Sequence, residues 1–306
     1  MSSLIEQAAQ RLEQLRQAGV VLPSMELAEP PIAAPAPRVA MPVLPPEPAA
    51  TSRRVELNLE AIAAAGIVTP TAPRSTMADQ FRVIKRPLIA NAVGKGVTML
   101  AHGNLIMVTS AMAGEGKSFT SVNLAMSIAA ELDHTVVLVD ADVARPSVLR
   151  MLGLPPGPGL LDVLEGKAEL ADSLLKTNVD KLTILPSGTP HPRATELLAS
   201  DAMGTLLDEM ATRYPDRIII FDSPPLLLTT EARVLASHMG QIVVVVAAGR
   251  TLQAAVQQAL DTIESCPVRM LVLNKARMDS SAYGYGYGYG YGYGYGASAT
   301  KEQPEG

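Results

Sequence analysis

Residues 105–118 read LIMVTSAMAGEGKS, an apolar run that passes into a glycine-containing loop ending in Gly-Lys-Ser. A helical pattern over residues 118–131 begins at once, so the predicted order is strand, loop, helix. In this order Gly114 and Gly116 let the loop curl until backbone N–H groups face phosphate oxygens. Lys117 can then reach the β- and γ-phosphates of a nucleotide, and the Ser118 hydroxyl can bind magnesium. The predicted nucleotide-binding residues of this loop are Ala113, Gly114, Glu115, Gly116, Lys117, Ser118 and Phe119.

Acidic residues follow two other apolar runs. Residues 136–139 lead to Asp140 and Asp142, and residues 218–221 lead to Asp222. The carboxyl ends of parallel strands share one edge of a sheet, which is where ligands bind in open α/β folds. Any one of these carboxylates could cap a strand in solvent, but three beside a phosphate-binding loop indicate a magnesium-nucleotide site. The predicted metal ligands are Ser118, Asp142 and Asp222.

Apolar runs alternate with helical patterns from about residue 77 to residue 279. The expected strands are residues 105–109, 136–139, 182–185, 218–221, 242–247 and 270–273, and the expected helices are residues 118–131, 202–213, 231–237 and 252–264. The runs are apolar throughout, which is typical of a parallel sheet buried on both faces. We therefore expect an α/β fold, a doubly wound and mainly parallel sheet flanked by helices. Asn274, after the last run, either contacts a purine edge or forms a turn.

Composition narrows the class of protein. The 306 residues carry a formal charge of -5 and no Lys/Arg-rich run, which argues against a nucleic-acid partner. The single cysteine, Cys266, cannot form an internal disulfide and fits a reducing cytoplasm. No apolar run approaches the roughly 18 residues that a membrane span needs, and the N-terminus lacks a signal-peptide pattern. Any membrane association is therefore expected to come from a partner.

The chain divides into four segments. Residues 1–20 contain an amphipathic helix whose short apolar stripe is expected to dock on its own domain or on a partner. Residues 21–75 are a Pro/Ala-rich linker, expected to be disordered, in which residues 55–67 are either a transient helix or plain linker. Residues 76–280 are expected to form the nucleotide-binding domain. Residues 281–306 form a tail that is expected to be mobile because glycine alternates with tyrosine.

These motifs resemble the cytoplasmic bacterial tyrosine kinases that control exopolysaccharide assembly, particularly the subgroup encoded with exosortase systems. Residues 110–118, 137–142 and 218–225 are similar to the Walker A, A′ and B elements of that family, in family order. Met112 stands where the related partitioning and septum-site ATPases, which share the fold, carry a lysine. An acidic–basic segment resembles the oligomerisation motif of the family, with Asp79, Arg82 and Lys85 in its three roles.

The resemblance implies a P-loop autokinase that uses ATP and magnesium and assembles into a ring. Lys117 would stabilise the transferred charge, Asp142 and Asp222 would act on the metal, and Asp140 is our candidate for the catalytic base. The partners implied are a separate membrane-anchored regulator of polysaccharide chain length, which recruits the cytoplasmic chain to the membrane, and a tyrosine phosphatase. The predicted phosphoacceptors, modified between subunits, are Tyr283, Tyr285, Tyr287, Tyr289, Tyr291, Tyr293 and Tyr295.

Some positions depart from the family pattern. Ala113 replaces a frequent proline, and Ala144 stands at the position of an arginine, with Arg145 beside it as the candidate replacement. Two other functions fit parts of the sequence: a non-kinase ATPase switch of the partitioning type, and a scaffold that no longer binds ATP. For the tail, the alternative is a low-complexity, self-associating segment whose tyrosines are never modified.

Overall fold

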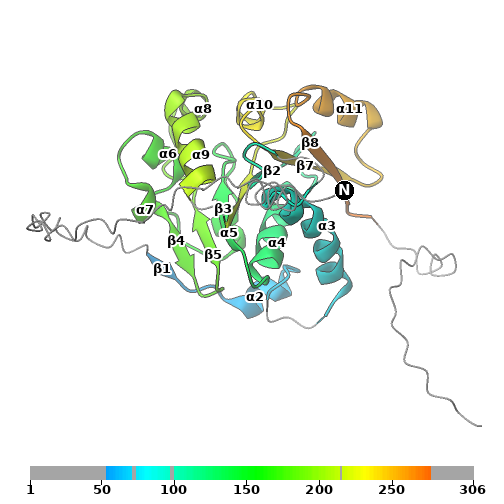
Figure 1. The fold of residues 1–306 in the computed structure, drawn as a ribbon, viewed down its shortest axis with the longest axis horizontal. Coiled ribbons are helices and arrows are strands. Elements are labelled where there is room, and N and C mark those ends of the chain that lie inside the picture. Colours follow the sequence, from blue (N-terminus) through cyan, green and yellow to red (C-terminus); the bar gives the residue numbers. More distant parts are fainter. Residues whose placement is uncertain (1–52, 71–73, 97–99, 214–215, 277–306) are drawn as a thin grey trace, which may run out of the picture. The chain divides into compact units, whose positions relative to one another are not determined.

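The structure is a computed structural model, and it describes residues 53–70, 74–96, 100–213 and 216–276 (Figure 1). The predicted N-terminal helix and the tyrosine tail lie outside the described residues. Within them, no helix is both long and apolar enough to cross a membrane.

The described residues form one sheet in the order β1-β4-β5-β3-β6-β2-β7-β8 (Figure 1). Neighbouring strands run parallel except β4 and β5, which pair antiparallel. The six predicted strands are all present, so the doubly wound, mainly parallel sheet is confirmed. The strands are β1 (Arg54–Val55), β2 (Leu105–Ser110), β3 (Thr135–Asp140), β4 (Leu175–Thr177), β5 (Leu182–Leu185), β6 (Arg217–Asp222), β7 (Gln241–Ala247) and β8 (Val268–Asn274).

Helices cover both faces of the sheet, because successive strand residues point to opposite faces. Ile106 and Val108 of β2 pack with α3 and α4, whereas Met107 packs with α9 and α10 on the other face. The helices are α2 (Leu59–Ala64), α3 (Thr76–Ala92), α4 (Lys117–Ala129), α5 (Val148–Met151), α6 (Leu160–Leu164), α7 (Leu170–Ser173), α8 (Ala194–Leu198), α9 (Asp201–Arg213), α10 (Glu231–Ala236) and α11 (Gln253–Asp261).

The N-terminal part of the domain extends beyond the predicted boundary at residue 76. β1 pairs with β4 at one edge of the sheet (Figure 1), and Leu57, Ile62 and Ile67 are buried against the α3 and α4 face. The Asn178 side chain bonds both the N–H and the C=O of Leu57, at 2.9 and 3.1 Å. The linker prediction is therefore wrong for residues 53–70, because so short a segment has too weak a pattern and is held by contacts with distant residues.

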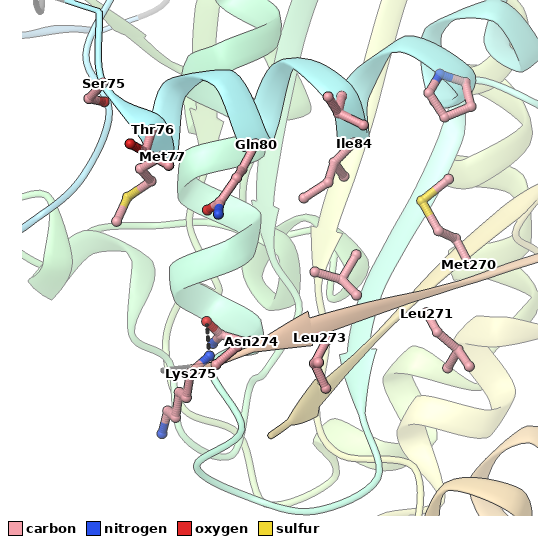
Figure 2. Close-up of a pocket in the computed structure, with 14 residues that line it drawn as sticks. Ser75, Thr76, Met77, Gln80, Ile84, Met270, Leu271, Leu273, Asn274 and Lys275 are labelled. Atoms are coloured by element: carbon pink, nitrogen blue, oxygen red, sulfur yellow. Dashed lines mark hydrogen bonds between the residues drawn. The ribbon is translucent and has the colours of Figure 1, made fainter. Parts of the chain in front are cut away.

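The opposite edge of the sheet is open. Leu271 and Leu273 of β8 are 53% and 64% exposed, so the described residues do not cover β8 on both faces, contrary to what its apolar sequence predicts. α3 and β8 border an apolar groove of about 1070 Å³ (Figure 2). Its far end, at Asn274 and Lys275, lies against the phosphate-binding loop.

Candidate functional site

The phosphate-binding loop, residues 110–118, joins the end of β2 to the start of α4. Gly114 and Gly116 have φ angles of 80° and 101°, which favour glycine over residues with a Cβ atom. Gly116 is also closely packed, because a Cβ atom there would lie 2.1 Å from Nδ2 of Asn274. The loop has the strand–loop–helix context that the sequence predicts, and the N-terminus of α4 provides unpaired N–H groups for an anion.

Hydrogen bonds of the Glu115 side chain stabilise the phosphate-binding loop. The buried Glu115 accepts a hydrogen bond from Met112 N at 2.7 Å through Oε2, and its Oε1 accepts another from the Thr251 hydroxyl. Because the Glu115 side chain holds the loop in shape, only its backbone N–H is available for the predicted contact with the nucleotide.

Asn274 and Lys275, at the end of β8 (Figure 2), also hold the loop. Asn274 Nδ2 donates to Glu115 O at 2.9 Å, and Lys275 Nζ donates to Gly114 O at 2.6 Å. Lys275 has a φ angle of 59°, and its N–H donates to Asn274 Oδ1 at 2.8 Å. Asn274 therefore caps a tight turn, one of the two expected roles, while its amide supports the loop. Sequence reasoning missed Lys275, although its place at a strand end on the ligand edge was a usable signal.

The predicted carboxylates converge on the lysine of the loop. Lys117 Nζ lies 2.6 Å from Asp142 Oδ2, 3.7 Å from Asp222 Oδ1 and 3.3 Å from Ser118 Oγ. Asp222 Oδ1 also accepts a hydrogen bond from Ser121 Oγ at 3.2 Å. β3 and β6 are neighbours, with Asp140 opposite Asp222 in the register, which is why residues far apart in sequence meet at one edge.

Burial shapes the electrostatics of this edge. Asp222 is fully buried, and burial raises its pKa against the opposing effect of Lys117. Asp140 is 1% exposed, and burial, followed by the charge of Asp222, raises its pKa to about 7. Its Oδ2 accepts two backbone N–H groups, from Ser147 at 3.0 Å and Val148 at 2.9 Å. Oδ1 of Asp140 and Oδ2 of Asp222 have no partner among the described residues.

The donor set fits magnesium rather than a metal held entirely by protein. Ser118, Asp142 and Asp222 are hard oxygen donors, and the unpartnered Oδ2 of Asp222 is a buried acceptor with no proton donor. Among the described residues, no group of three or more His, Cys, Asp or Glu side chains is placed to hold a metal. Magnesium needs no such group, because it keeps several waters and binds through one or two carboxylates and substrate phosphates.

A pocket of about 560 Å³ opens beside these groups. Its lining includes the polar side chains of Lys117, Ser118 and Asp142, which we call the floor, and the apolar side chains of Phe119, Met151 and Leu228, which we call the wall. Of the loop residues predicted from sequence, Ala113, Gly114 and Gly116 also line it. Asp140 is not among its lining residues, because its carboxylate turns inward to the backbone N–H groups of the segment before α5. The role of Asp140 as catalytic base stays a prediction, and its buried carboxylate holds the segment before α5 through these two hydrogen bonds.

The three residues of the predicted oligomerisation motif do not share one face of α3. Asp79 and Arg82 form an exposed ion pair along the helix. Lys85 is buried, with Nζ 2.7 Å from Glu131 Oε1 and hydrogen-bonded to Ser127 O of α4. Steps of three residues drift around a helix of 3.6 residues per turn, so Lys85 lies about 120° from Asp79. Lys85 is therefore buried against α4 instead of being exposed beside Asp79 and Arg82.

Comparison with known proteins places these features in a family. A family model described as "ParA: NUBPL iron-transfer P-loop NTPase" matches residues 102–185. Tyrosine-protein kinase YwqD of Bacillus subtilis is 31% identical over 221 residues, 71% of this chain and 90% of YwqD. Tyrosine-protein kinase CpsD of Streptococcus agalactiae is 33% identical over 199 residues, 63% of this chain and 85% of CpsD.

Two solved structures are similar over most of their length. The chimerical protein CapA2B2 has a TM-score of 0.59 and 25% identity, covering 72% of this chain and 99% of that one. The kinase domain of the Escherichia coli tyrosine kinase ETK has a TM-score of 0.52 and 25% identity, covering 74% of this chain and 97% of that one.

Proposed function

Because the chain belongs to the bacterial tyrosine-protein kinases, we propose that it transfers the γ-phosphate of ATP to the tyrosines of its own C-terminal tail. The observation that carries this proposal is the position of Lys117, which lines an open pocket together with Asp142 and pairs with both Asp142 and the buried Asp222. A cation and two carboxylates at the end of a phosphate-binding loop are the groups that phosphoryl transfer from a metal-bound nucleotide requires.

Binding of the triphosphate changes the partners of Lys117. The ammonium group that bonds Asp142 in the free site turns to phosphate oxygens, while the N–H groups of residues 114–118 cradle them. Ser118, Asp142 and Asp222 would then hold magnesium, directly or through water. When bound, the metal neutralises charge on the phosphates.

The acceptor hydroxyl meets Asp142 rather than Asp140. Asp142 lines the pocket, whereas Asp140 is enclosed and positions the segment between β3 and α5. Arg145 lines the same pocket and is exposed, so it is our candidate for the arginine that the family places one residue earlier. We therefore expect Asp142→Asn to abolish phosphorylation and Asp140→Asn to retain part of it; total loss in Asp140→Asn, with the fold intact, would restore Asp140 as the base.

Transfer takes place between subunits of a ring. By the statistics of Gly-rich chains, a tyrosine some 15 residues past the domain lies about 20 Å from it, within reach of a neighbouring site. Each phosphate adds about -1.5 to -2 charge, so several on one tail repel one another and favour disassembly. Asp79 and Arg82, exposed on α3, remain the candidates for the contact between subunits. Identical assembly sizes before and after phosphorylation would contradict this switch.

The biological setting follows from the resemblance. We propose that the chain is cytoplasmic, is recruited to the membrane by a separate membrane-anchored chain-length regulator, and is reset by a tyrosine phosphatase during exopolysaccharide assembly. The similarity to a chimeric structure named for two components, CapA2B2, supports a two-part system.

The test is phosphotyrosine mass spectrometry of the full chain after incubation with ATP and magnesium, with and without a partner's cytoplasmic segment. Phosphate on Tyr283–Tyr295 that disappears in Lys117→Met is the expected result, since Lys117 is the cation of the site. Lys176→Met is the matched control, because Lys176 is exposed on β4, away from the loop. ATP turnover with unmodified tyrosines in the presence of a bound partner would favour the ATPase switch.

A further inference from the structure

The apolar wall of the pocket has no evident role in binding a triphosphate. It comes from three separate elements: Phe119 from α4, Met151 from the end of α5 and Leu228 from the loop after β6. Phe119 and Met151 pack partly against the core, but Leu228 is 54% exposed and belongs to neither apolar cluster of the described residues. An exposed leucine over a charged floor suggests a ligand group with an apolar body.

The strand order shows which part of the substrates meets this wall. The phosphate-binding loop follows β2, which lies between β6 and β7. Asp142 and Asp222 follow β3 and β6, on one side of the loop. Asp142 and Asp222 would hold magnesium on this side of the loop, where it would neutralise charge on the terminal phosphates, so the terminal phosphate belongs on this side.

A second pocket on the other side of the loop offers room for the nucleotide base. This pocket, of about 410 Å³, lies toward β7 and is lined by Met112, Gly114, Arg250 and Leu252. A nucleotide whose γ-phosphate faces Asp142 directs its base toward this second pocket. The wall of Phe119, Met151 and Leu228 therefore stands on the side of the phosphoryl acceptor.

We propose that Phe119, Met151 and Leu228 form the subsite for the aromatic ring of the acceptor tyrosine. The inference rests on the proposed kinase function and deepens it by naming what selects the acceptor. Phe119 offers an aromatic neighbour and Met151 a polarisable sulfur, both of which favour contact with a ring. The ring on the wall directs its hydroxyl to the floor at Lys117 and Asp142.

The reaction balances with the groups present. The phenolic oxygen forms a bond to the γ-phosphorus while the bond from that phosphorus to the β–γ bridging oxygen breaks, and ADP leaves with the electron pair. The phenolic proton passes to the Asp142 carboxylate and then to solvent. A serine hydroxyl reaches the floor without a ring to bury, so the wall selects tyrosine.

The tail sequence suits a subsite that binds a single tyrosine ring and contacts no neighbouring side chain of the tail. Every tyrosine from Tyr283 to Tyr295 is followed by glycine, and all but Tyr283 are preceded by glycine as well. Glycine lets the tail backbone approach the pocket closely and presents no second side chain to the site. The seven tyrosines are then nearly equivalent acceptors, because each offers the wall the same group.

The test uses the full chain with its seven tail tyrosines changed to alanine, so that the tail offers neither an acceptor hydroxyl nor a competing ring, and a free peptide of residues 281–298 as acceptor. Leu228→Asp should raise the KM for the peptide about tenfold with kcat nearly unchanged, because the lost contact is made equally before and during transfer. The KM for ATP should stay unchanged, and Leu228→Phe should restore a low peptide KM. Leu132→Asp, at an 85% exposed leucine outside the pocket lining, is the matched control.

The outcomes separate the subsite from the kinase function. Unchanged peptide KM in Leu228→Asp would overturn the subsite, as would an equal rise in the KM for ATP, which would assign the wall to the base. Phosphotyrosine missing from the unsubstituted chain would instead refute the kinase function, and it is measured before any variant is compared.

Discussion

Replacing Asp140 by asparagine should make the stability of the free protein less dependent on pH. In the folded chain, burial and the charge of Asp222 raise the pKa of Asp140 from 3.8 to about 7. A carboxyl group with a raised pKa binds its proton more tightly in the folded state than in the unfolded state. Its contribution to stability is therefore greatest below pH 3.8 and is lost as pH rises toward about 7.

The size of the effect follows from the linkage relation. At about 1.36 kcal/mol per pH unit, ionised Asp140 lowers the free energy of unfolding by roughly 4 kcal/mol once the pH exceeds both pKa values. Part of this loss is already present at about pH 5, so the change between about pH 5 and pH 8 is roughly 2–3 kcal/mol. Asparagine carries no charge at either pH and keeps an oxygen for the N–H groups of Ser147 and Val148.

The assay is urea unfolding of Asp140→Asn and the parent chain at both pH values, without nucleotide or magnesium. The difference in unfolding free energy should shift in favour of the variant by about 2–3 kcal/mol on going from the lower to the higher pH. Comparing the variant-minus-parent difference in unfolding free energy at the two pH values removes any effect of the substitution that is the same at both. Asp133→Asn, at an exposed turn, should show no such shift. A difference that is the same at both pH values for Asp140→Asn would refute the reasoning.

Two further predictions concern the loop and α3. Gly116→Ala should abolish binding of a fluorescent ATP analogue, because its Cβ atom would lie 2.1 Å from Nδ2 of Asn274. Gly166→Ala is the control: Gly166 also has a positive φ angle, 69°, but a Cβ atom there meets open space. This variant should lose only about 1–2 kcal/mol of stability and keep binding the analogue. Lys85→Met should lower the unfolding free energy by about 1–3 kcal/mol, since it leaves a buried acceptor unpaired. Arg82→Ala should stay within about 0.5 kcal/mol in the same urea assay, because its ion pair is exposed, while reducing assembly measured by sedimentation. Equal losses of stability in the two α3 variants, or full assembly of Arg82→Ala, would contradict these roles.

The fold class and the phosphate-binding loop could be predicted from sequence because their signals are local. The apolar runs mark strands within a few residues, and the order of strand, loop and helix around Lys117 identifies the loop without knowledge of its neighbours. The convergence of Asp142 and Asp222 could also be predicted from the sequence, because the carboxyl ends of parallel strands lie at one edge of a sheet.

Other features depended on which distant residues pack together. Glu115 and Asn274, 159 residues apart, meet only because β2, β7 and β8 are neighbours in the sheet. The rotation of α3 against α4, which no spacing rule specifies, buries Lys85. Likewise, the docking of residues 53–70 and the enclosure of Asp140 arise from burial and backbone hydrogen bonds supplied by other parts of the chain. The sequence thus predicted which residues gather at the phosphate-binding loop, whereas tertiary packing determined which of them line the pocket and which support it.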